Sequence, residues 1–260
     1  MSVLGLALAC SPDKKSESLP VVGSNFDEMN FLGIASIKPE RLEYEVMYGI
    51  VKGGKALYET KPELINAYGT RCWKTTLIGQ TAGSVGWFTH IADTFYNYVD
   101  SSKTRTVATE RHIREQRYTL HEITTFENDT AITITEKRPK PFRKKLPAGA
   151  ALGPIGSLQA MRFLPYETMQ KFDTANVSFF MHRRTYRLRI VYLGLEKMKS
   201  KYEKGMAFKV TPVLPSNSMM SESDRAYIWI SADENRVPVY SKAETKFGSV
   251  TVKLTRFKTY

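Results

Sequence analysis

Apolar and polar side chains alternate with a period of two in segment after segment from about residue 42 to the C-terminus. The clearest example is residues 42–50, where four side chains share one face: Leu42, Tyr44, Val46 and Tyr48. Side chains alternate across a β-strand with this period, whereas those of a helix repeat every 3.6 residues. About a dozen such segments, separated by turn-forming residues, predict a mainly β chain with at most one or two short helices.

Glycine, proline and charge indicate where the strands break. Residues 52–55 are predicted as a hairpin turn, and residues 111–126 as one long strand. Residues 137–147 hold six positive charges and three prolines. Because proline cannot donate to a sheet ladder, we expect a loop or the exit of the chain from the sheet there. Helical spacing predicts one helix over residues 157–163, with Ser157 as its cap.

The N-terminus carries the pattern of an export signal. Residues 1–9 are apolar and end in small side chains directly before Cys10, and polar residues follow. This arrangement resembles the lipobox of a bacterial lipoprotein signal peptide, in which the cysteine receives the lipid anchor. We expect residues 1–9 to be a signal peptide whose true start lies upstream of Met1. Residues 10–39 would then be the lipidated cysteine and a flexible tether, and residues 40–260 a single mostly β domain.

The alternative is an ordinary apolar N-terminus with a free cysteine. No stretch of about 18 apolar residues is present, so the sequence predicts no membrane-spanning helix. Lipidation of Cys10 would therefore be the means by which the chain is held at a membrane.

An excess of basic residues favours acidic partners. The chain holds 38 Lys and Arg against 26 Asp and Glu, which gives a net charge of +12. Such a surface suits nucleic acid, anionic lipid headgroups, lipopolysaccharide or acidic glycans. Export would exclude nucleic acid as the partner. The alternative is a solvated basic surface with no dedicated partner.

Two basic stretches, in residues 137–145 and 182–189, are candidates for binding an anionic ligand. In a strand the arginines of the second stretch would share one face, and guanidinium groups bind phosphate or carboxylate oxygens bidentately. The alternative is an exposed, solvated face. The candidate residues are Lys140, Arg143, Lys144 and Lys145 in the first stretch and Arg183, Arg187 and Arg189 in the second.

No combination of residues points to catalysis, a cofactor or a metal. The nearest pair of the four histidines, His112 and His121, is nine residues apart, which places the two side chains on opposite faces of one strand. Cys72 is expected to be a small buried apolar residue and not a nucleophile. Asp93 and Asp100 are weak candidates for a pair of carboxylates. We therefore predict no catalytic residue, no metal site and no cofactor.

The C-terminal residues form the most specific pattern in the chain. A Trp-hydrophobic-Ser strand end, a tight turn and a return through Arg and Pro precede a last strand that begins with Gly-Ser. The residues that carry this pattern are Trp229, Ser231, Asp233, Arg236, Pro238 and Gly248. The pattern resembles the closing hairpin of a bacterial family of exported proteins, domain of unknown function family 3108. Residues 42–56 and 93–100 resemble other parts of that family, so that the resemblance covers residues 40–258.

The closing motif also has a structural interpretation of its own. Residues 233–236 are predicted to form a tight turn, since Asp and Asn side chains bond to nearby backbone groups. Trp229 is expected to anchor the core, and Ser231 and Arg236 to brace the turn. The alternative is that the motif lines a binding surface.

The resemblance implies an exported protein of the periplasm or outer membrane whose family has no established activity. It also implies a curved, mostly antiparallel sheet, either a half-barrel or a β-roll, similar to the sheets that shelter lipid in lipoprotein carriers. The expected function is that of a non-enzymatic cell-envelope lipoprotein on the periplasmic side of the outer membrane. It would be a binding or scaffold module for lipid, lipopolysaccharide, acidic glycan or an envelope protein assembly.

Two alternatives remain open at this point: a structural subunit of a periplasmic assembly, and an enzyme that acts on envelope lipid or glycan. A deep apolar cavity would favour a lipid carrier. Carboxylates in a polar cleft would favour the enzyme, and a flat, exposed apolar edge would favour assembly.

Overall fold

The computed structural model describes eight parts of the chain: residues 37–83, 86, 90–103, 105–147, 150–199, 204–213, 226–245 and 248–260. The predicted signal peptide, Cys10 and the predicted tether up to residue 36 lie outside the described residues. Within these ranges, no helix is both long and apolar enough to cross a membrane.

Fifteen strands of the described residues form one antiparallel sheet. The strands are β1 (Glu40–Tyr48), β2 (Val51–Thr60), β3 (Ile65–Ala67), β4 (Thr70–Thr81), β5 (Ala92–Asp100), β6 (Thr106–Glu115), β7 (Tyr118–Glu127), β8 (Thr130–Thr135), β9 (Arg138–Lys145), β10 (Thr174–Met181), β11 (Arg184–Lys199), β12 (Lys204–Val213), β13 (Ala226–Ser231), β14 (Pro238–Thr245) and β15 (Gly248–Thr259). Helix α3 (Pro154–Arg162) interrupts them between β9 and β10. The prediction of a mainly β chain is confirmed.

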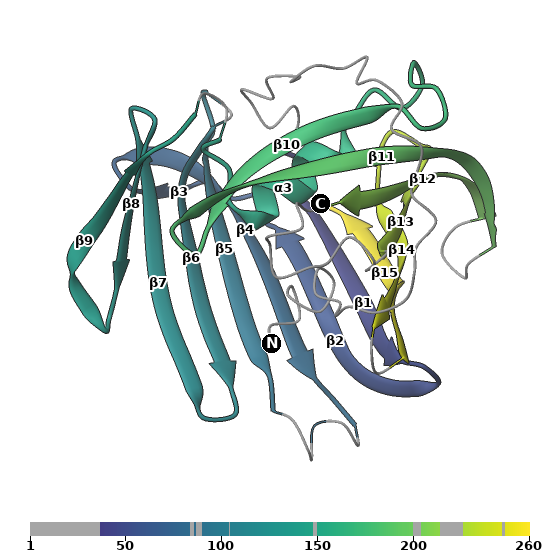
Figure 1. Ribbon diagram of the computed structural model, residues 1–260, viewed down its shortest axis with the longest axis horizontal. Coiled ribbons are helices and arrows are strands. Elements are labelled where there is room, and N and C mark those ends of the chain that lie inside the picture. The colour runs from purple at the N-terminus through teal and green to yellow at the C-terminus, as the bar shows by residue number, and fades with distance from the viewer. Residues whose placement is uncertain are drawn as a thin grey trace.

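The sheet is open and strongly curved. Its strand order is β10-β11-β12-β13-β14-β15-β1-β2-β4-β5-β6-β7-β8-β9, and β3 pairs with β4 beside this path. The first and last strands are neighbours, because β1 pairs with β15 along its whole length. Figure 1 shows the β10–β11 hairpin arching across one end of the curve, with helix α3 beneath it on the concave side. The expected curved, mostly antiparallel sheet is therefore confirmed.

The predicted long strand 111–126 is wrong, because it consists of two strands. Strand β6 ends at Glu115 and β7 begins at Tyr118, and the turn between them places Gln116 at a positive φ of 48°. No Gly, Pro, Asn or Asp marks this turn. A hairpin loop of two residues shifts the alternation by one position, since the directly opposed residues Glu115 and Tyr118 share a face, and reading residues 111–126 as one strand overlooked this shift.

The predicted turn at 52–55 and the predicted loop at 137–147 are also wrong. The first hairpin turns at Gly49, which has a positive φ of 56°, and residues 52–55 lie within β2. Gly54 is needed there for a close approach, because a Cβ atom would lie 2.6 Å from the carbonyl oxygen of Gln80. Residues 138–145 form β9, the last strand in the sheet order. An edge strand tolerates proline, since only one of its sides needs donors.

The helix begins three residues earlier than expected. Pro154 occupies the first turn, where its missing N–H has no partner to lose, and Gly153 precedes it without a side-chain cap. Ser157 lies inside the helix and donates its hydroxyl to the carbonyl oxygen of Pro154 at 2.8 Å. Gly153 permits a close approach to the sheet, because a Cβ atom there would overlap the methyl group of Thr109 on β6.

Cross-strand pairing arranges the inner face of the sheet in rows. The row nearest the helix is polar and buried, and it runs through Glu40, Thr60, Thr75, Asn97, Thr109, Thr124 and Thr133. The next row begins with the apolar and aromatic side chains of Leu42, Tyr58, Leu77 and Phe95. Threonine hydroxyls within the polar row bond to one another, at 2.8 Å between Thr60 and Thr75. Pairing of this kind satisfies polar groups that have no access to water.

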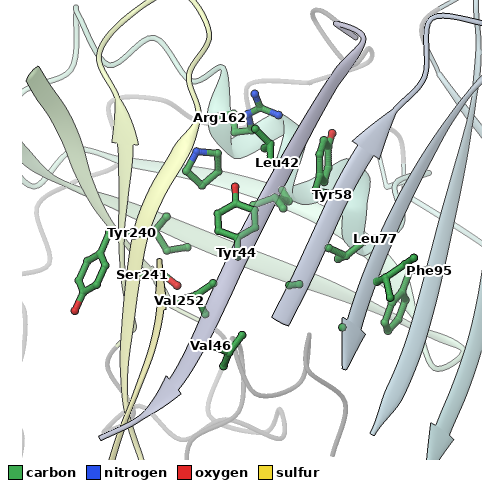
Figure 2. A pocket seen from close by; sticks show the side chains of 16 residues that line it. Leu42, Tyr44, Val46, Tyr58, Leu77, Phe95, Arg162, Tyr240, Ser241 and Val252 are labelled. Carbon is green, nitrogen blue, oxygen red and sulfur yellow. The ribbon is translucent and has the colours of Figure 1, made fainter. Parts of the chain in front are cut away.

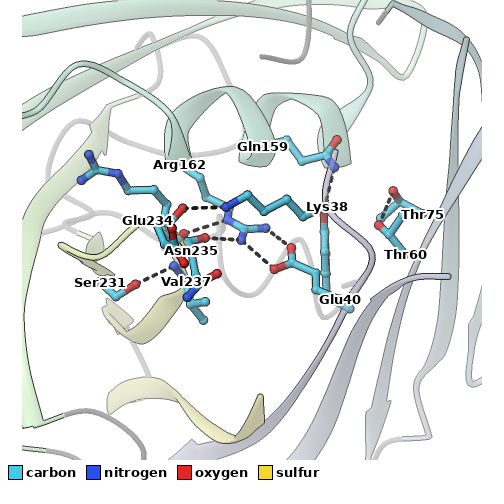
Figure 3. A network of polar contacts seen from close by, with 12 residues as sticks. Lys38, Glu40, Thr60, Thr75, Gln159, Arg162, Ser231, Glu234, Asn235 and Val237 are labelled. Carbon is cyan, nitrogen blue, oxygen red and sulfur yellow. Dashed lines mark hydrogen bonds and ion pairs between the residues drawn. The ribbon is translucent and has the colours of Figure 1, made fainter. Parts of the chain in front are cut away.

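A buried ion pair fastens the helix to the sheet. Arg162, the last residue of α3, donates to both carboxylate oxygens of Glu40 on β1, and Nη2 lies 3.0 Å from Oε2. The side chains are 3% and 5% exposed. Arg162 also donates to the backbone carbonyls of Asn235 and Arg236, at 2.9 and 2.8 Å (Figure 3). One guanidinium group thus joins the helix, the first strand and the turn before β14.

We predict that Glu40→Gln lowers the free energy of unfolding by about 3–5 kcal/mol, because it leaves the buried Arg162 charge without its counter-charge. The matched control is Glu43→Gln on the same strand. The Glu43 carboxylate pairs with Arg41 at 2.8 Å, but its side chain is 33% exposed, so the control should cost about 1 kcal/mol or less. Urea denaturation of both variants measures the difference. Equal destabilisation by the two substitutions would contradict the assigned role of the buried pair.

Candidate functional site

A pocket opens on the concave face where the sheet carries its smallest side chains. Ala56 on β2 lies directly opposite Gly79 on β4, and Tyr44 on β1 lies opposite Ala56 on its other side. Alternation directs all three positions to the inner face, in the row beyond Leu42 and Tyr58. Because neighbouring rows carry large side chains, the small residues leave a cavity of about 140 Å³ that opens to solvent.

The lining of this pocket is almost entirely apolar. Figure 2 shows Leu42, Tyr44 and Val46 following one another along β1, with Tyr58, Leu77 and Phe95 on the neighbouring strands. The opposite wall comes from β13, β14 and β15, and α3 covers one end. The lining residues are Leu42, Tyr44, Val46, Ala56, Tyr58, Leu77, Ile78, Gly79, Phe95, Leu158, Arg162, Ile228, Pro238, Tyr240, Ser241 and Val252.

The guanidinium of Arg162 and the phenol oxygen of Tyr58, at the helix end of the pocket, already have partners. The guanidinium of Arg162 is held by Glu40 and two backbone carbonyls. Gln159 on the helix donates to the phenol oxygen of Tyr58 at 2.8 Å. Burial raises the pKa of Tyr58 to about 12 and also raises the pKa of Tyr44. Both phenols are therefore neutral near pH 7, and this end of the pocket offers no free charge to a ligand.

A second hollow lies on the outer face, and its walls are charged. Its lining includes two carboxylates, those of Glu43 and Glu45, and the cations of Arg41, Lys52 and Lys55. Glu43 pairs with Arg41 at 2.8 Å, and Glu45 pairs with Lys52. Both carboxylates are thus engaged by cations. Exposed pairs of this kind are common on protein surfaces and contribute little.

The arginines predicted to share one strand face do not all lie on a strand. Arg183 sits in the turn before β11 with a positive φ of 62°, and its guanidinium lies over the ring of Phe142 at 5.2 Å from the centroid. Arg187 and Arg189 are exposed on β11, two residues apart and therefore on one face. Arg183 was grouped with Arg187 and Arg189 on the premise that the whole stretch lies in one strand, whereas β11 begins at Arg184.

The other basic candidates lie on the edge strand β9 and not in a loop. Arg143 and Lys145 occupy one face of the strand, and Lys144 lies on the other. Lys140 is exposed on the same strand. The strand divides the cluster between two faces, so it forms no single patch. Among the described residues that line the apolar pocket, none comes from either basic stretch.

The closing motif holds a turn beside the pocket. Asp233 accepts hydrogen bonds at one oxygen from the Ser231 hydroxyl at 2.7 Å and from the backbone N–H of Asn235 at 3.0 Å. Ser231 in turn accepts from the backbone N–H of Val237 at 2.8 Å (Figure 3). The carbonyls that this turn presents bind Arg162. Pro238, which follows the turn, lines the pocket.

Three further motif residues have other surroundings. Trp229 is half-buried, and its indole N–H donates to Glu196 at 2.9 Å. The guanidinium of Arg236 pairs with Glu167 and lies over the ring of Phe208. Gly248 begins β15 at a positive φ of 112°, a conformation that favours glycine.

The placement of His112 and His121 corrects the sequence argument. They were expected on opposite faces of one strand, but they lie on neighbouring strands and directly opposite each other. The sequence analysis did not predict the turn at 116–117. The two histidines are equally far from this turn along the chain, so the hairpin pairs them. Asp93 and Asp100 have separate partners: Asp93 accepts from the N–H of Arg114, and Asp100 accepts from Ser102. Cys72 is buried, and its burial raises the pKa of the thiol.

Comparison with solved structures gives the fold class of this sheet. A crystal structure of a β-barrel-like protein of the domain of unknown function DUF1849 from Brucella abortus is similar, with a TM-score of 0.60 and 13% identity. The match covers 86% of this chain and 98% of the other. At this identity the likeness concerns the fold alone.

The family follows from the sequence itself. A family model described as "Protein of unknown function (DUF3108)" matches residues 43–255, and the chain belongs to this family. The resemblance seen in the closing hairpin is therefore confirmed. No curated protein matches the chain.

We predict that His182 remains neutral down to about pH 5. Its ring lies 3.3 Å from Nη1 of Arg111, and burial together with this positive charge lowers its pKa to about 4. Because the unfolded value is about 6.5, the folded state binds fewer protons between the two values, and stability falls as pH falls through that window. Titration of the imidazole by NMR measures the midpoint. The same residue in denaturant is the control, and a folded midpoint near 6.5 would refute the prediction.

Proposed function

We propose that this chain is a non-enzymatic cell-envelope lipoprotein whose sheet binds an acyl chain in the pocket beneath helix α3. The observation that carries the proposal is the hollow at Ala56 and Gly79, which is walled by apolar side chains. Apolar sites take up ligands mainly by removing apolar surface from water. A lipid is the class of envelope molecule that offers a long apolar chain to such a site.

The physical chemistry of apolar burial agrees with this assignment. Each buried CH₂ group contributes about 0.8 kcal/mol before the costs of association are subtracted, so affinity should rise with the number of acyl carbons that enter the pocket. Tyr44 and Tyr58 add hydrogen-bonding groups to the pocket. Because both phenols are neutral, an acyl chain can enter without removing water from a charged group. The net charge of +12 would favour lipids with anionic headgroups over neutral ones.

The alternatives receive less support from the described residues. Among those that line the pocket there is no carboxylate, and the carboxylates of the outer hollow are paired with Arg41 and Lys52. An enzyme would need such groups free in a cleft. The edge strand β9 carries five exposed or half-buried cations, at Arg138, Lys140 and 143–145. Charges of this kind oppose strand-to-strand association, and so disfavour assembly through this edge.

The proposed anchor is Cys10, acylated after removal of residues 1–9, and the proposed location is the periplasmic side of the outer membrane. The support is the apolar segment that ends in small residues before the cysteine. A protein tethered in this way would hold its pocket within reach of the membrane whose lipids it binds.

Substitution Ala56→Trp tests the pocket, because an indole at this position fills the hollow. The delipidated wild type should bind 11-(dansylamino)undecanoic acid with increased dansyl fluorescence. Ala56→Trp should weaken this binding at least tenfold, a loss of about 1.4 kcal/mol or more. The matched control is Lys55→Trp, one residue away on β2 and exposed on the other face, which should bind as the wild type does.

Circular dichroism and thermal unfolding establish that both variants fold. Equal affinity of Ala56→Trp and Lys55→Trp for the probe would refute the pocket as the binding site. Failure of the wild type to bind the probe, with long-chain fatty acids also failing to bind in calorimetry, would refute the proposed ligand class.

Mass spectrometry of the protein isolated from its native membrane tests the anchor. We expect the mature chain to begin at Cys10 with acyl groups attached, and lipid to be recovered with it. A Cys10→Ser variant should appear in the soluble fraction without the added mass. An unmodified Cys10 in the native protein would refute the lipoprotein assignment while leaving the pocket experiment unaffected.

A further inference from the structure

Three metal-ligating side chains meet on the outer face of the sheet, away from the pocket. His112 on β6 and His121 on β7 are a directly opposed cross-strand pair, and Glu110 lies two residues before His112 on the same face. The intervening Arg111 points to the inner face, where it pairs in register with Phe95 of the pocket wall. The group therefore shares strands with the pocket region and occupies the other side of the sheet.

The geometry directs three donor atoms to one point. Oε1 of Glu110 lies 2.7 Å from Nε2 of His112 and 2.9 Å from Nε2 of His121. The two imidazole rings are stacked, with centroids 4.2 Å apart and planes 20° from parallel. All three ligand atoms lie within 4.8 Å of one another. Parallel rings thus present their Nε2 atoms side by side to the same carboxylate oxygen.

A second layer of contacts fixes how these ligands are presented. Nδ1 of His121 donates to Glu136 at 3.2 Å, which leaves Nε2 as the ring nitrogen that faces Glu110. The phenol of Tyr98 donates to Oε2 of Glu110 at 3.1 Å, so that Oε1 is the oxygen turned toward the histidines. Metal-bound histidines commonly donate their other ring nitrogen to a carboxylate, which fixes the tautomer and the ring orientation.

We propose that Glu110, His112 and His121 form a binding site for a borderline divalent metal ion of the Zn²⁺ class. Two imidazole nitrogens and one carboxylate oxygen match the ligand preference of Zn²⁺, whereas Ca²⁺ and Mg²⁺ require mostly oxygen ligands. Three protein ligands leave a fourth position of the tetrahedron to water or to an external donor.

Little movement is needed to admit the ion. Ligand bonds of about 2.0–2.2 Å in a tetrahedron separate neighbouring donor atoms by about 3.3 Å. The two separations to Glu110 Oε1 therefore widen by about half an ångström. The side chains of His112 and His121 are 46% and 30% exposed, so they can turn without disturbing the core. In the metal-free protein, hydrogen bonds to the carboxylate hold the same three groups together.

Calorimetric titration with ZnCl₂ tests the site on the full chain without an affinity tag. All proteins carry Cys10→Ser, because a free thiol would bind the metal itself, and are stripped with chelator beforehand. We expect one Zn²⁺ per chain, and a loss of affinity of at least tenfold in His112→Gln and in His121→Gln. The matched control is His90→Gln, an exposed histidine outside the group, which should bind as the parent does.

Glu136→Gln supplies an independent check, because its side chain is 72% exposed and its loss should not impair folding. Loss of such a partner typically weakens metal binding by about 10–100-fold. Substitution with Co²⁺ should give the visible absorption of a four- or five-coordinate ion, and the two histidine variants should lack it. The proposal is overturned if the parent binds no Zn²⁺, or if the histidine and Glu136 variants bind it as tightly as His90→Gln does.

Discussion

The ion pair between Arg162 and Glu40 is the interaction on which the rest of this structure depends. A charged pair at 3% and 5% exposure is stable only when each partner finds all of its hydrogen bonds. Here the guanidinium reaches a carboxylate on the first strand and two carbonyls of the turn before β14. Those contacts set the position of the helix, and the helix covers one end of the pocket. Because the charge of Arg162 is paired with Glu40, this end of the pocket has no free charge.

The inner face of the sheet consists of one buried polar row and neighbouring apolar rows. The polar row that starts at Glu40 lies nearest the helix and is buried by it, with hydroxyl pairs such as Thr60–Thr75. The next rows are apolar, and the small residues Ala56 and Gly79 open a space among them. A packed interior normally leaves few voids larger than a water molecule. The cavity of about 140 Å³ at this point is the place where we propose that a ligand binds.

The sequence predicted what depends on local pattern. The period of two identified most of the strands, and Asp and Asn at 233–236 identified the closing turn. The turn at Gln116 was missed, because it contains none of the residues that usually favour positive φ. Missing it removed the pairing of His112 with His121. The edge strand β9 was missed because its prolines are tolerated only at an edge, and edges are set by the whole sheet.

The pocket and the ion pair depend on contacts far apart in the sequence. Glu40 and Arg162 are separated by 122 positions, and no local signal connects them. Gly79 lies opposite Ala56 only in the register that the β2–β4 pairing adopts, and a shift of one residue would turn both to the other face. The closing hairpin identified the family, but no local pattern indicated the apolar pocket, and the predicted ligand-binding residues were those of the two basic stretches.

The most direct test of the central claim is a crystal structure of the protein isolated from its native membrane without delipidation. The account predicts continuous electron density for an acyl chain that passes over Ala56 and Gly79 beneath helix α3, in contact with Leu77 and Phe95. A pocket occupied only by ordered water, or a lipid bound elsewhere on the sheet with this hollow closed by side chains, would contradict it.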